Sequence, residues 1–402
     1  MRLLVVLFAG AAWLRAQAAA DALSPQILLL AKVRDRAVWN LRHQPNYTCV
    51  ETVERSFRPA ATRKYRLIDT LRLEVALVDG KEMFGWPGTK HFEDTDLRNL
   101  VPDGAFGNGN FATHARAIFQ GNSATFDYRG EITVGERPAI RFDYSVPLLG
   151  SGYNLRVGER TSIVAYRGSI YADPKTYDLE RLEVEAVDIP VVLGMARTSD
   201  RMDYARTPIG DGEFLLPEES ELSMIDLNGA ESRNRVRFAS CRQFSGESVL
   251  TFGDPPPPEV TPKAVEQIVL PSGVAITLRL DDDLDVRNAA IGDSVRAHLQ
   301  NDVKQKSRVL IAKGATAIGR ISRLERSAGY TSIGLEFSEM ESTGVHADLR
   351  LRLEDVAGHE FLAAPRRGLQ LPSARPGEGM IHLGPGRFRL GRGILMFWRT
   401  NS

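Results

Sequence analysis

The sequence predicts a mostly β protein: a half-open antiparallel β-barrel with an N-terminal helix and a helical lid, followed by a smaller β-barrel domain. Two observations predict this fold class. Many half-apolar segments of strand length follow one opening helix and are joined by Gly- and Pro-rich turns, as in a bent antiparallel sheet. Four successive prolines at 255–258 then separate these segments from a second set of short strand-like segments.

The opening helix and the strands of the first domain, expected over 22–252, follow from local patterns. Ser24 and Pro25 suit the start of a helix, and apolar residues recur at three- and four-residue steps to about His43. Alternation then predicts strands at 47–57, 67–78, 124–133, 138–146, 160–172, 178–187, 213–226 and 233–243.

Residues 92–121 interrupt this series of strands. Short helices are expected at 94–101 and 111–119, around a Gly-rich loop at 104–109. Two interpretations stay open, a mobile lid over one face of the sheet and a surface loop with incidental helical turns.

A proline-rich linker at 253–262 leads to the second domain at 263–402. Residues 363–383 are expected to form a loose arm before the last strand. Strands are predicted at 274–280, 294–299, 307–311, 316–324, 332–340, 345–356 and 387–398.

The first twenty residues have the layout of a secretory signal peptide. Arg2 precedes an apolar run at 3–14, and small residues follow at Ala16, Ala18 and Ala20. The run is shorter than the roughly 20 residues that span a bilayer. We expect cleavage after Ala18 or Ala20 and a periplasmic or secreted protein; an uncleaved N-terminal anchor is the alternative.

The charge balance limits the classes of partner. The 402 residues carry 51 basic and 51 acidic side chains, so the basic excess usual for a nucleic-acid binder is absent, and we expect no nucleic-acid partner. The arm from 365 to 402 nevertheless holds seven arginines and one acid, Glu378, for a net charge of +6. Contact with an anionic membrane or an acidic partner is one interpretation, and a closing strand with outward arginines is the other.

No motif for catalysis or metal binding stands out in the sequence. His359-Glu360 lacks the second histidine of HExxH, and GxSxG, SxxK and the P-loop are absent. The GDSV run at 292–295 matches the nucleophile block of GDSL-type hydrolases only superficially, and the acidic run at 281–285 fits a solvated turn. We therefore expect no enzyme, no metal and no cofactor.

The two cysteines are placed for pairing. Cys49 lies in the first predicted strand and Cys241 in the last strand of the same domain, and export favours oxidation. A disulfide is the favoured prediction, and two separate buried thiols are the alternative.

Four features of the first domain follow one another along the chain: the opening helix, YTCVE at 47–51, SIYADPKTYDLERL at 169–182 and FLLP at 214–217. In this order they resemble the LolA/LolB-like family of outer-membrane lipoprotein carriers and sorting proteins. The resemblance implies a half-open barrel around a helical lid, whose concave apolar face takes acyl chains or other lipid-like groups.

The second domain carries LPSGV at 270–274, AIGDSV at 290–295, and VLIAKGA at 309–315 followed by Gly319-Arg320-Ile321. These motifs resemble the β-barrel of TrbI/VirB-type conjugation-channel proteins, which usually have Pro where Ala312 stands here. The resemblance implies a β-barrel and an envelope setting.

The leading hypothesis is a non-enzymatic, exported envelope protein that binds a lipid-like or lipoprotein ligand, with an acyl chain on the concave face of the first domain. The alternative is a periplasmic scaffold that contacts other envelope proteins and binds no small ligand. The expected ligand-binding residues are apolar residues of the lid, the rim and the concave face: Leu71, Leu73, Val75, Leu97, Phe106, Phe111, Ile118 and Phe119.

Overall fold

The structure is a computed structural model that describes residues 23–88, 92, 97–100, 112–244, 266–327, 330–357 and 371–401. The described residues confirm the mostly β fold. The chain divides into two compact units, each assembled from separate stretches: unit 1 comprises 1–44 and 109–217, and unit 2 comprises 45–108 and 218–402. The predicted signal peptide and the linker at 253–262 lie outside the described residues.

Helix α2 (Pro25–Arg42) begins and ends close to where the sequence predicts. The Ile27 N–H donates to Ser24 Oγ at 3.4 Å, and Pro25 occupies the first turn, where its missing N–H costs nothing. The other helical segments are α3 (Leu97–Leu100), α4 (Thr113–Gln120), η1 (Leu148–Gly150) and η2 (Val191–Leu193). Among the residues described, no helix combines the length and apolar character needed to cross a bilayer.

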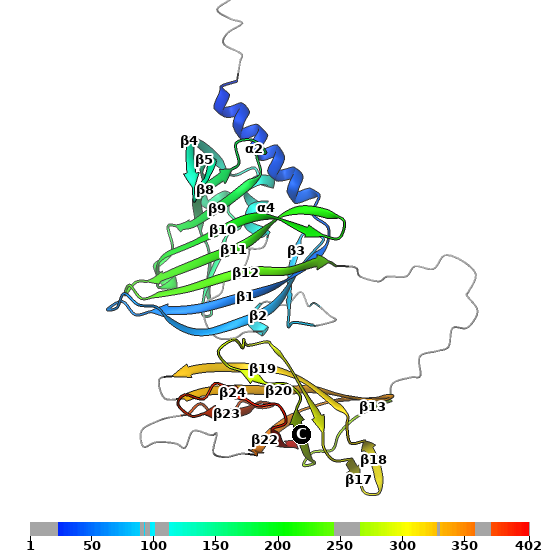
Figure 1. Ribbon diagram of the computed structural model, residues 1–402. Helices are drawn as coiled ribbons and strands as arrows, with labels where there is room; N and C mark the ends of the chain where they lie inside the picture. The colour runs from blue at the N-terminus through cyan, green and yellow to red at the C-terminus, as the bar shows by residue number, and fades with distance from the viewer. Residues whose placement is uncertain are drawn as a thin grey trace, which may run out of the picture. The chain divides into compact units, whose positions relative to one another are not determined.

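A ten-stranded sheet runs in the order β3-β2-β1-β12-β11-β10-β9-β8-β5-β4 (Figure 1). The order has two ends, β3 and β4, as expected for a half-open barrel. The strands are β1 (Tyr47–Arg58), β2 (Arg66–Val78), β3 (Lys81–Gly85), β4 (Thr125–Val134), β5 (Arg137–Val146), β8 (Ala165–Ala172), β9 (Leu179–Val187), β10 (Met195–Ile209), β11 (Gly212–Asp226) and β12 (Glu231–Gln243). A separate hairpin pairs β6 (Asn154–Val157) with β7 (Arg160–Ile163).

Strand β10 is the main element that the sequence analysis missed. Its buried face presents Thr198, Asp200, Met202 and Tyr204, of which half are polar. Because the apolar alternation is this weak, the period-two pattern does not reveal the strand. β3 and β6 were also missed, and the predicted strand at 160–172 is broken at Val164.

The core of unit 1 lies where α2 and α4 pack against one face of the sheet. Val33, Ala37 and Leu41 of α2 meet Ala115, Ile118 and Phe119 of α4 over buried side chains of β5, β8, β9 and β10. The helical turns expected at 111–119 are thus realised as α4, an amphipathic helix whose apolar side is in the core.

The second sheet lies in unit 2 and runs β13-β21-β20-β19-β16-β14-β25-β22, with β23 also paired to β20. Its strands are β13 (Glu266–Ile268), β14 (Ala275–Leu280), β16 (Ser294–Leu299), β19 (Thr316–Ser327), β20 (Tyr330–Ser342), β21 (Val345–Asp348), β22 (Leu351–Val356), β23 (Gly379–Leu383) and β25 (Leu395–Thr400). Two small ladders pair β15 (Leu284–Asp285) with β24 (Arg389–Leu390), and β17 (Val303–Gln305) with β18 (Arg308–Ile311).

Part of the expected loose arm at 363–383 is ordered as strand β23. Ile381 pairs with Ile333 of β20, and both side chains are buried. The glycines and prolines around this segment suggested irregular chain, whereas burial of its alternate apolar residues holds it in the sheet. The predicted strand at 345–356 is divided into β21 and β22.

Within unit 2, the AIGDSV motif extends the edge of β2. The Arg72 N–H donates to the Ile291 carbonyl and the Ile291 N–H donates to the Thr70 carbonyl, each at 2.8 Å. Arg72 also forms an ion pair with Asp293. The motif therefore contacts the part of β2 that does not pair with β3, through backbone hydrogen bonds and an ion pair.

The two cysteines form a disulfide between β1 and β12. Their Cα atoms are 4.1 Å apart, although the residues are 192 positions apart in sequence. Around them, Thr48 pairs with Arg242 and Val50 with Ala239, with a bulge between the two pairs. The bridge thus links the second stretch of unit 2 to the first.

Candidate functional site

A pocket in unit 1 lies between α2, α4 and the strands β9 to β11. Its empty space is about 340 Å³, a figure that includes the open solvent at its mouth. Ala37 of α2, Ala115 of α4 and Ala112, which directly precedes α4, are small enough to leave this space open. The lining comprises Ala37, Asn40, Leu41, Gln44, Ala112, Ala115, Phe119, Leu179, Tyr204 and Leu215.

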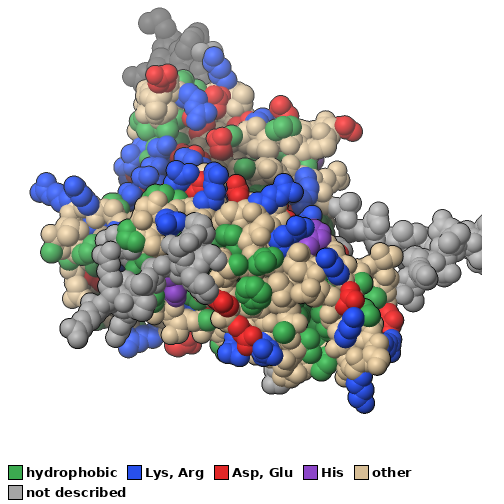
Figure 2. All heavy atoms as spheres, turned by 60° about the horizontal axis from the view of Figure 1, so that its bottom comes forward, with side chains coloured by type: hydrophobic (Ala, Val, Ile, Leu, Met, Phe, Trp, Pro, Cys, Tyr) green, Lys and Arg blue, Asp and Glu red, His purple; other side chains and the backbone are tan. Residues whose placement is uncertain are grey.

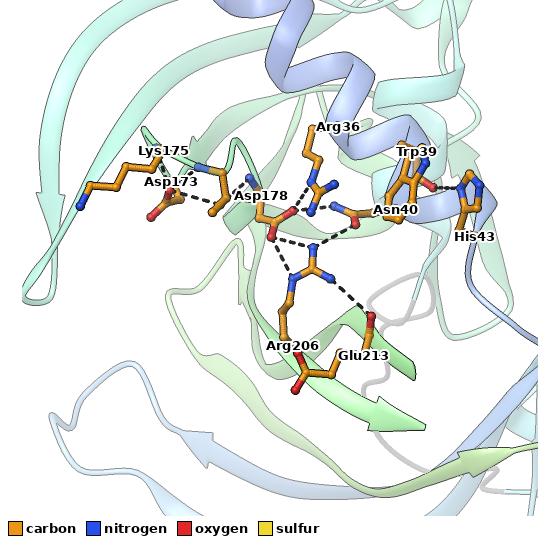
Figure 3. Close-up of polar contacts among 10 residues, drawn as sticks. Arg36, Trp39, Asn40, His43, Asp173, Lys175, Asp178, Arg206 and Glu213 are labelled. Atoms are coloured by element: carbon orange, nitrogen blue, oxygen red, sulfur yellow. Dashed lines mark hydrogen bonds and ion pairs between the residues drawn. The ribbon is translucent and has the colours of Figure 1, made fainter. Parts of the chain in front are cut away.

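A turn between β8 and β9 places a carboxylate beside the pocket. Asp173 Oδ1 accepts the N–H groups of Lys175 at 2.8 Å and Thr176 at 2.7 Å, which closes an Asx-type turn. Tyr177 then adopts a left-handed φ of 60°. This local folding positions Asp178 at the start of β9, where it faces α2 and β10 (Figure 3).

Asp178 is the centre of a polar cluster. Its Oδ1 accepts Arg36 Nε at 2.7 Å and Asn40 Nδ2 at 2.9 Å, and its Oδ2 accepts Arg206 Nη2 at 2.7 Å and Nε at 3.0 Å. Arg206 Nη2 also donates to Asn40 Oδ1 at 3.3 Å. Burial raises the pKa of Asp178, but these charged donors outweigh burial and hold its pKa below the usual range. The carboxylate is therefore ionised at neutral pH.

The rim around this cluster is basic and aromatic. The Arg36 guanidinium lies 4.9 Å from the ring centroid of Trp39, whose side chain is 48% exposed. Lys32, one turn earlier on α2, lies 5.4 Å from the ring centroid of Tyr177. Cations over aromatic faces at a pocket rim suit the polar end of an amphiphile.

A second buried carboxyl group, that of Asp200, lies on the inner face of β10. Asp200 is only 4% exposed, and its Oδ1 has no hydrogen-bond partner among the described residues. Burial raises the pKa of Asp200 to about 7. Burial, together with the charge of Asp200, also raises the pKa of Tyr153.

His114 of α4 is buried close to Tyr153, edge-on at 5.3 Å between ring centroids. Burial lowers the pKa of His114 to about 4, so the imidazole is neutral at physiological pH. Within the described part of the chain, no hydrogen bond joins His114 to a hydroxyl or a carboxylate. His114 and Tyr153 thus form a buried aromatic contact.

The predicted ligand-binding residues are distributed over both units. Phe119 lines the pocket, and Ile118 lies next to it in the core. Leu97 is buried in α3 of unit 2, and Phe106 and Phe111 lie outside the described residues. The concave-face residues predicted on β2 are completely buried in unit 2: Leu71, Leu73 and Val75. A ligand-binding role for these residues stays a prediction.

The sequence analysis missed most of the polar residues at the pocket. Arg206 and Tyr204 lie on the unrecognised strand β10, and Asp178 is brought to α2 across 138 positions of sequence. One local feature pointed to the site: Asn40 interrupts the buried apolar face of α2 between Ala37 and Leu41. A buried amide in such a position requires partners from elsewhere in the fold.

The basic C-terminal arm is partly neutralised where it is described. Arg399 Nε lies 2.6 Å from Glu354, and Arg389 Nη1 lies 3.4 Å from Asp283. On the face shown in Figure 2, basic and acidic side chains are interspersed. Contact of the arm with an anionic membrane stays a prediction, with a smaller effective charge than the count of arginines indicates.

One group on β20 and β21 has the residue types of a cation site. Ligand atoms of Glu339, Glu341 and His346 lie within 4.8 Å of one another. Glu341 is exposed, and the other two side chains are only partly buried. Exposed acidic groups of this kind are common on surfaces without an ion, so we assign no metal to them.

Comparison with known proteins gives structural likeness only; no family model and no curated protein matches the chain. A LolA superfamily protein from Nitrosomonas europaea is 11% identical with a TM-score of 0.29, covering 56% of this chain and 95% of that one. A putative outer membrane lipoprotein-sorting protein domain from Vibrio parahaemolyticus is 10% identical (TM-score 0.29; 52% and 91% covered). A DUF1329 family protein from Desulfovibrio piger is 12% identical (TM-score 0.28; 54% and 93% covered). Likeness at this level assigns no function.

Proposed function

We propose that this chain is an exported, non-enzymatic envelope protein that binds the apolar chain of a lipid-like ligand in the pocket of unit 1. The lining of the pocket carries the proposal, because seven of its ten residues are alanine, leucine or phenylalanine. Burial of an alkyl chain contributes about 0.8 kcal/mol per CH₂, so a short stretch of chain gives useful affinity without any catalytic group.

Export is supported by the disulfide between Cys49 and Cys241, since such bonds persist in oxidising compartments. The N-terminal sequence, with its layout of a signal peptide, agrees with this setting. The second-domain motifs predict a resemblance to conjugation-channel barrels, and this prediction agrees with an envelope location.

Narrowing the pocket tests the proposed function. Ala115 is 2% exposed and lines the pocket from α4, so Ala115→Leu places three extra carbon atoms in the space proposed for the ligand. We expect dodecanoate binding, measured by calorimetry, to weaken about tenfold, in line with the loss of one or two buried methylenes and local overpacking. Native mass spectrometry of the purified protein, which we expect to show a bound lipid, is an independent measurement.

The matched control is Ala31→Leu, which makes the same change at an exposed position of α2. Thermal unfolding of both variants shows whether the fold persists. A folded Ala115→Leu protein that binds dodecanoate as tightly as the unaltered protein contradicts the placement of the ligand. A folded unaltered protein that takes up no amphiphile contradicts the proposed function itself.

A scaffold or interaction protein is the second candidate, and one surface favours it. Leu149 is fully exposed, and Leu148, Ile163, Val191 and Val192 are each more than half exposed. The 2.8 Å hydrogen bond from Arg160 Nη1 to the Val192 carbonyl holds β7, which carries Ile163, beside η2, which carries Val191 and Val192. An exposed aliphatic cluster of this kind marks surfaces that bind other proteins.

A further inference from the structure

We propose that the ligand is an anionic amphiphile whose carboxylate or phosphate head is held by Arg36 and Arg206 at the rim of the pocket. The inference rests on the proposed function, because it assumes that the tail of the same molecule occupies the pocket. It adds the chemical class of the head group and the residues that select it.

The two arginines reach one place from different elements. Arg36 projects from α2 and Arg206 from β10, and both donate to the single carboxylate of Asp178 (Figure 3). Their side chains are 33% and 31% exposed, whereas that of Asp178 is 12% exposed. The guanidinium groups are thus the outer members of the cluster and the carboxylate is its inner member.

Donor capacity remains on Arg36. It binds Asp178 through Nε, and within the described residues neither of its terminal nitrogens makes a hydrogen bond. The opposite side of the guanidinium is free for a planar or tetrahedral oxyanion, which arginine binds with paired N–H donors. Arg206 uses Nε and Nη2 for Asp178 and Nη1 for the Glu213 carbonyl.

The charges at the rim favour an anion. Two guanidinium groups against one carboxylate leave a formal excess of one positive charge, and Lys32 stands nearby on α2. The other acid of the turn, Asp173, directs Oδ1 to its own backbone and to the Thr176 hydroxyl. The carboxylate of Asp178 neutralises one of the two guanidinium charges, so one positive charge remains to attract an oxyanion.

The rim and the pocket are joined by one residue. Asn40 lines the pocket and also bonds to both Asp178 and Arg206. A head group on the arginines therefore lies one hydrogen-bonded residue away from the apolar lining. A molecule with an anionic head and an alkyl tail meets both environments at once.

The test compares three amphiphiles with the same tail: dodecanoate, dodecyl phosphate and neutral dodecanol. For Arg206→Gln we expect about tenfold weaker binding of the anions and less than a twofold change for dodecanol, because the variant removes the positive charge that Asp178 leaves in excess. Arg167→Gln, which removes an exposed arginine paired with Glu185, is the matched control. Inorganic phosphate without a tail is expected not to bind at millimolar concentration.

The outcomes separate the two proposals. A loss confined to dodecanoate assigns a fatty-acid-like head, and a loss confined to dodecyl phosphate assigns a phospholipid-like head. Two results overturn the inference while the proposed function stands. One is tight binding of inorganic phosphate, which has no tail. The other is that Arg206→Gln binds each of the three amphiphiles as tightly as the unaltered protein does. Failure of all three to bind the unaltered protein overturns the proposed function.

A charge-removal variant distinguishes ligand binding from a structural role. Asp178→Asn removes the negative charge that pairs with both arginines. We therefore expect dodecanoate to bind about threefold more tightly, and the affinity for dodecanol to stay unchanged. A purely structural cluster gives no gain for the anion. If the thermal melt shows that this variant does not fold, Arg206→Lys decides the question: it keeps the charge and is expected to retain more anion binding than Arg206→Gln.

Discussion

At the scale of single residues, two buried carboxyl groups stand out on the inner face of the strands. Asp200 on β10 and Glu51 on β1 are each less than a tenth exposed, and each has an oxygen without a hydrogen-bond partner in the described structure. Burial raises the pKa of Asp200 to about 7, and burial together with Glu82 raises the pKa of Glu51 to about 8. Both groups are therefore neutral in the folded protein at mildly acidic pH.

The folded-state pKa of Asp200 lies above its unfolded value of about 3.8, so the free energy of unfolding falls as the pH rises from about 4 to about 7. The loss amounts to at most about 4 kcal/mol by pH 8, at about 1.4 kcal/mol per unit of pKa. We expect Asp200→Asn to remove much of this decrease in the free energy of unfolding, so that the variant is more stable than the unaltered protein at pH 8. Urea unfolding between pH 4 and 8 measures the free energy of unfolding of both proteins.

The control for this prediction is Asp127→Asn, on an exposed position of β4. It is expected to leave the pH dependence unchanged. A pH dependence for Asp200→Asn equal to that of the unaltered protein contradicts the assignment of the titrating group, because Glu51, whose pKa is also raised, contributes equally to both proteins.

At the scale of elements, the contact between β2 and the segment at 290–293 depends on one glycine. Gly292 has a φ of +98°, and a Cβ there collides with the Arg72 carbonyl oxygen and the Trp86 ring. We expect Gly292→Ala to lower the free energy of unfolding by about 2 kcal/mol or more, from backbone strain and overpacking together. Denaturant unfolding is the measurement.

Gly273→Ala is the matched control for this substitution. Gly273 also has a positive φ, +85°, but a Cβ there meets nothing within 4 Å. The difference between the two variants isolates the steric part of the effect. Equal losses of stability in both would show that the contact with Arg72 and Trp86 adds nothing to the cost of the backbone conformation.

At the scale of the whole molecule, the disulfide closes a loop of 192 positions between β1 and β12. The chain-entropy estimate for a loop of this length is about 5 kcal/mol, and measured losses on removal of native disulfides are about 2–5 kcal/mol. We expect the double variant Cys49→Ser, Cys241→Ser to lose a few kcal/mol in denaturant unfolding. The unaltered protein under reducing conditions should lose the same amount, and an unchanged midpoint in both cases contradicts a stabilising bridge.

Much of the local structure was predictable because it depends on neighbouring residues. Ser24 and Pro25 mark the start of α2, and strands such as β1 and β2 alternate clearly over their length. Strand β10 escaped prediction since its inner face mixes Asp200 and Thr198 with apolar residues. Strand β23 escaped because its surroundings are rich in glycine and proline, and only pairing with β20 orders it.

The sequence by itself determined the class of fold, the opening helix and the placement of the cysteines in strands, because caps, alternation and turn residues act over a few positions. Only the tertiary structure decided which residues surround the pocket. Asp178, Arg36 and Arg206 meet across 142 and 28 positions of sequence, and Asn40 joins them to the apolar lining. Such contacts follow from strand order and helix packing, which no local pattern specifies.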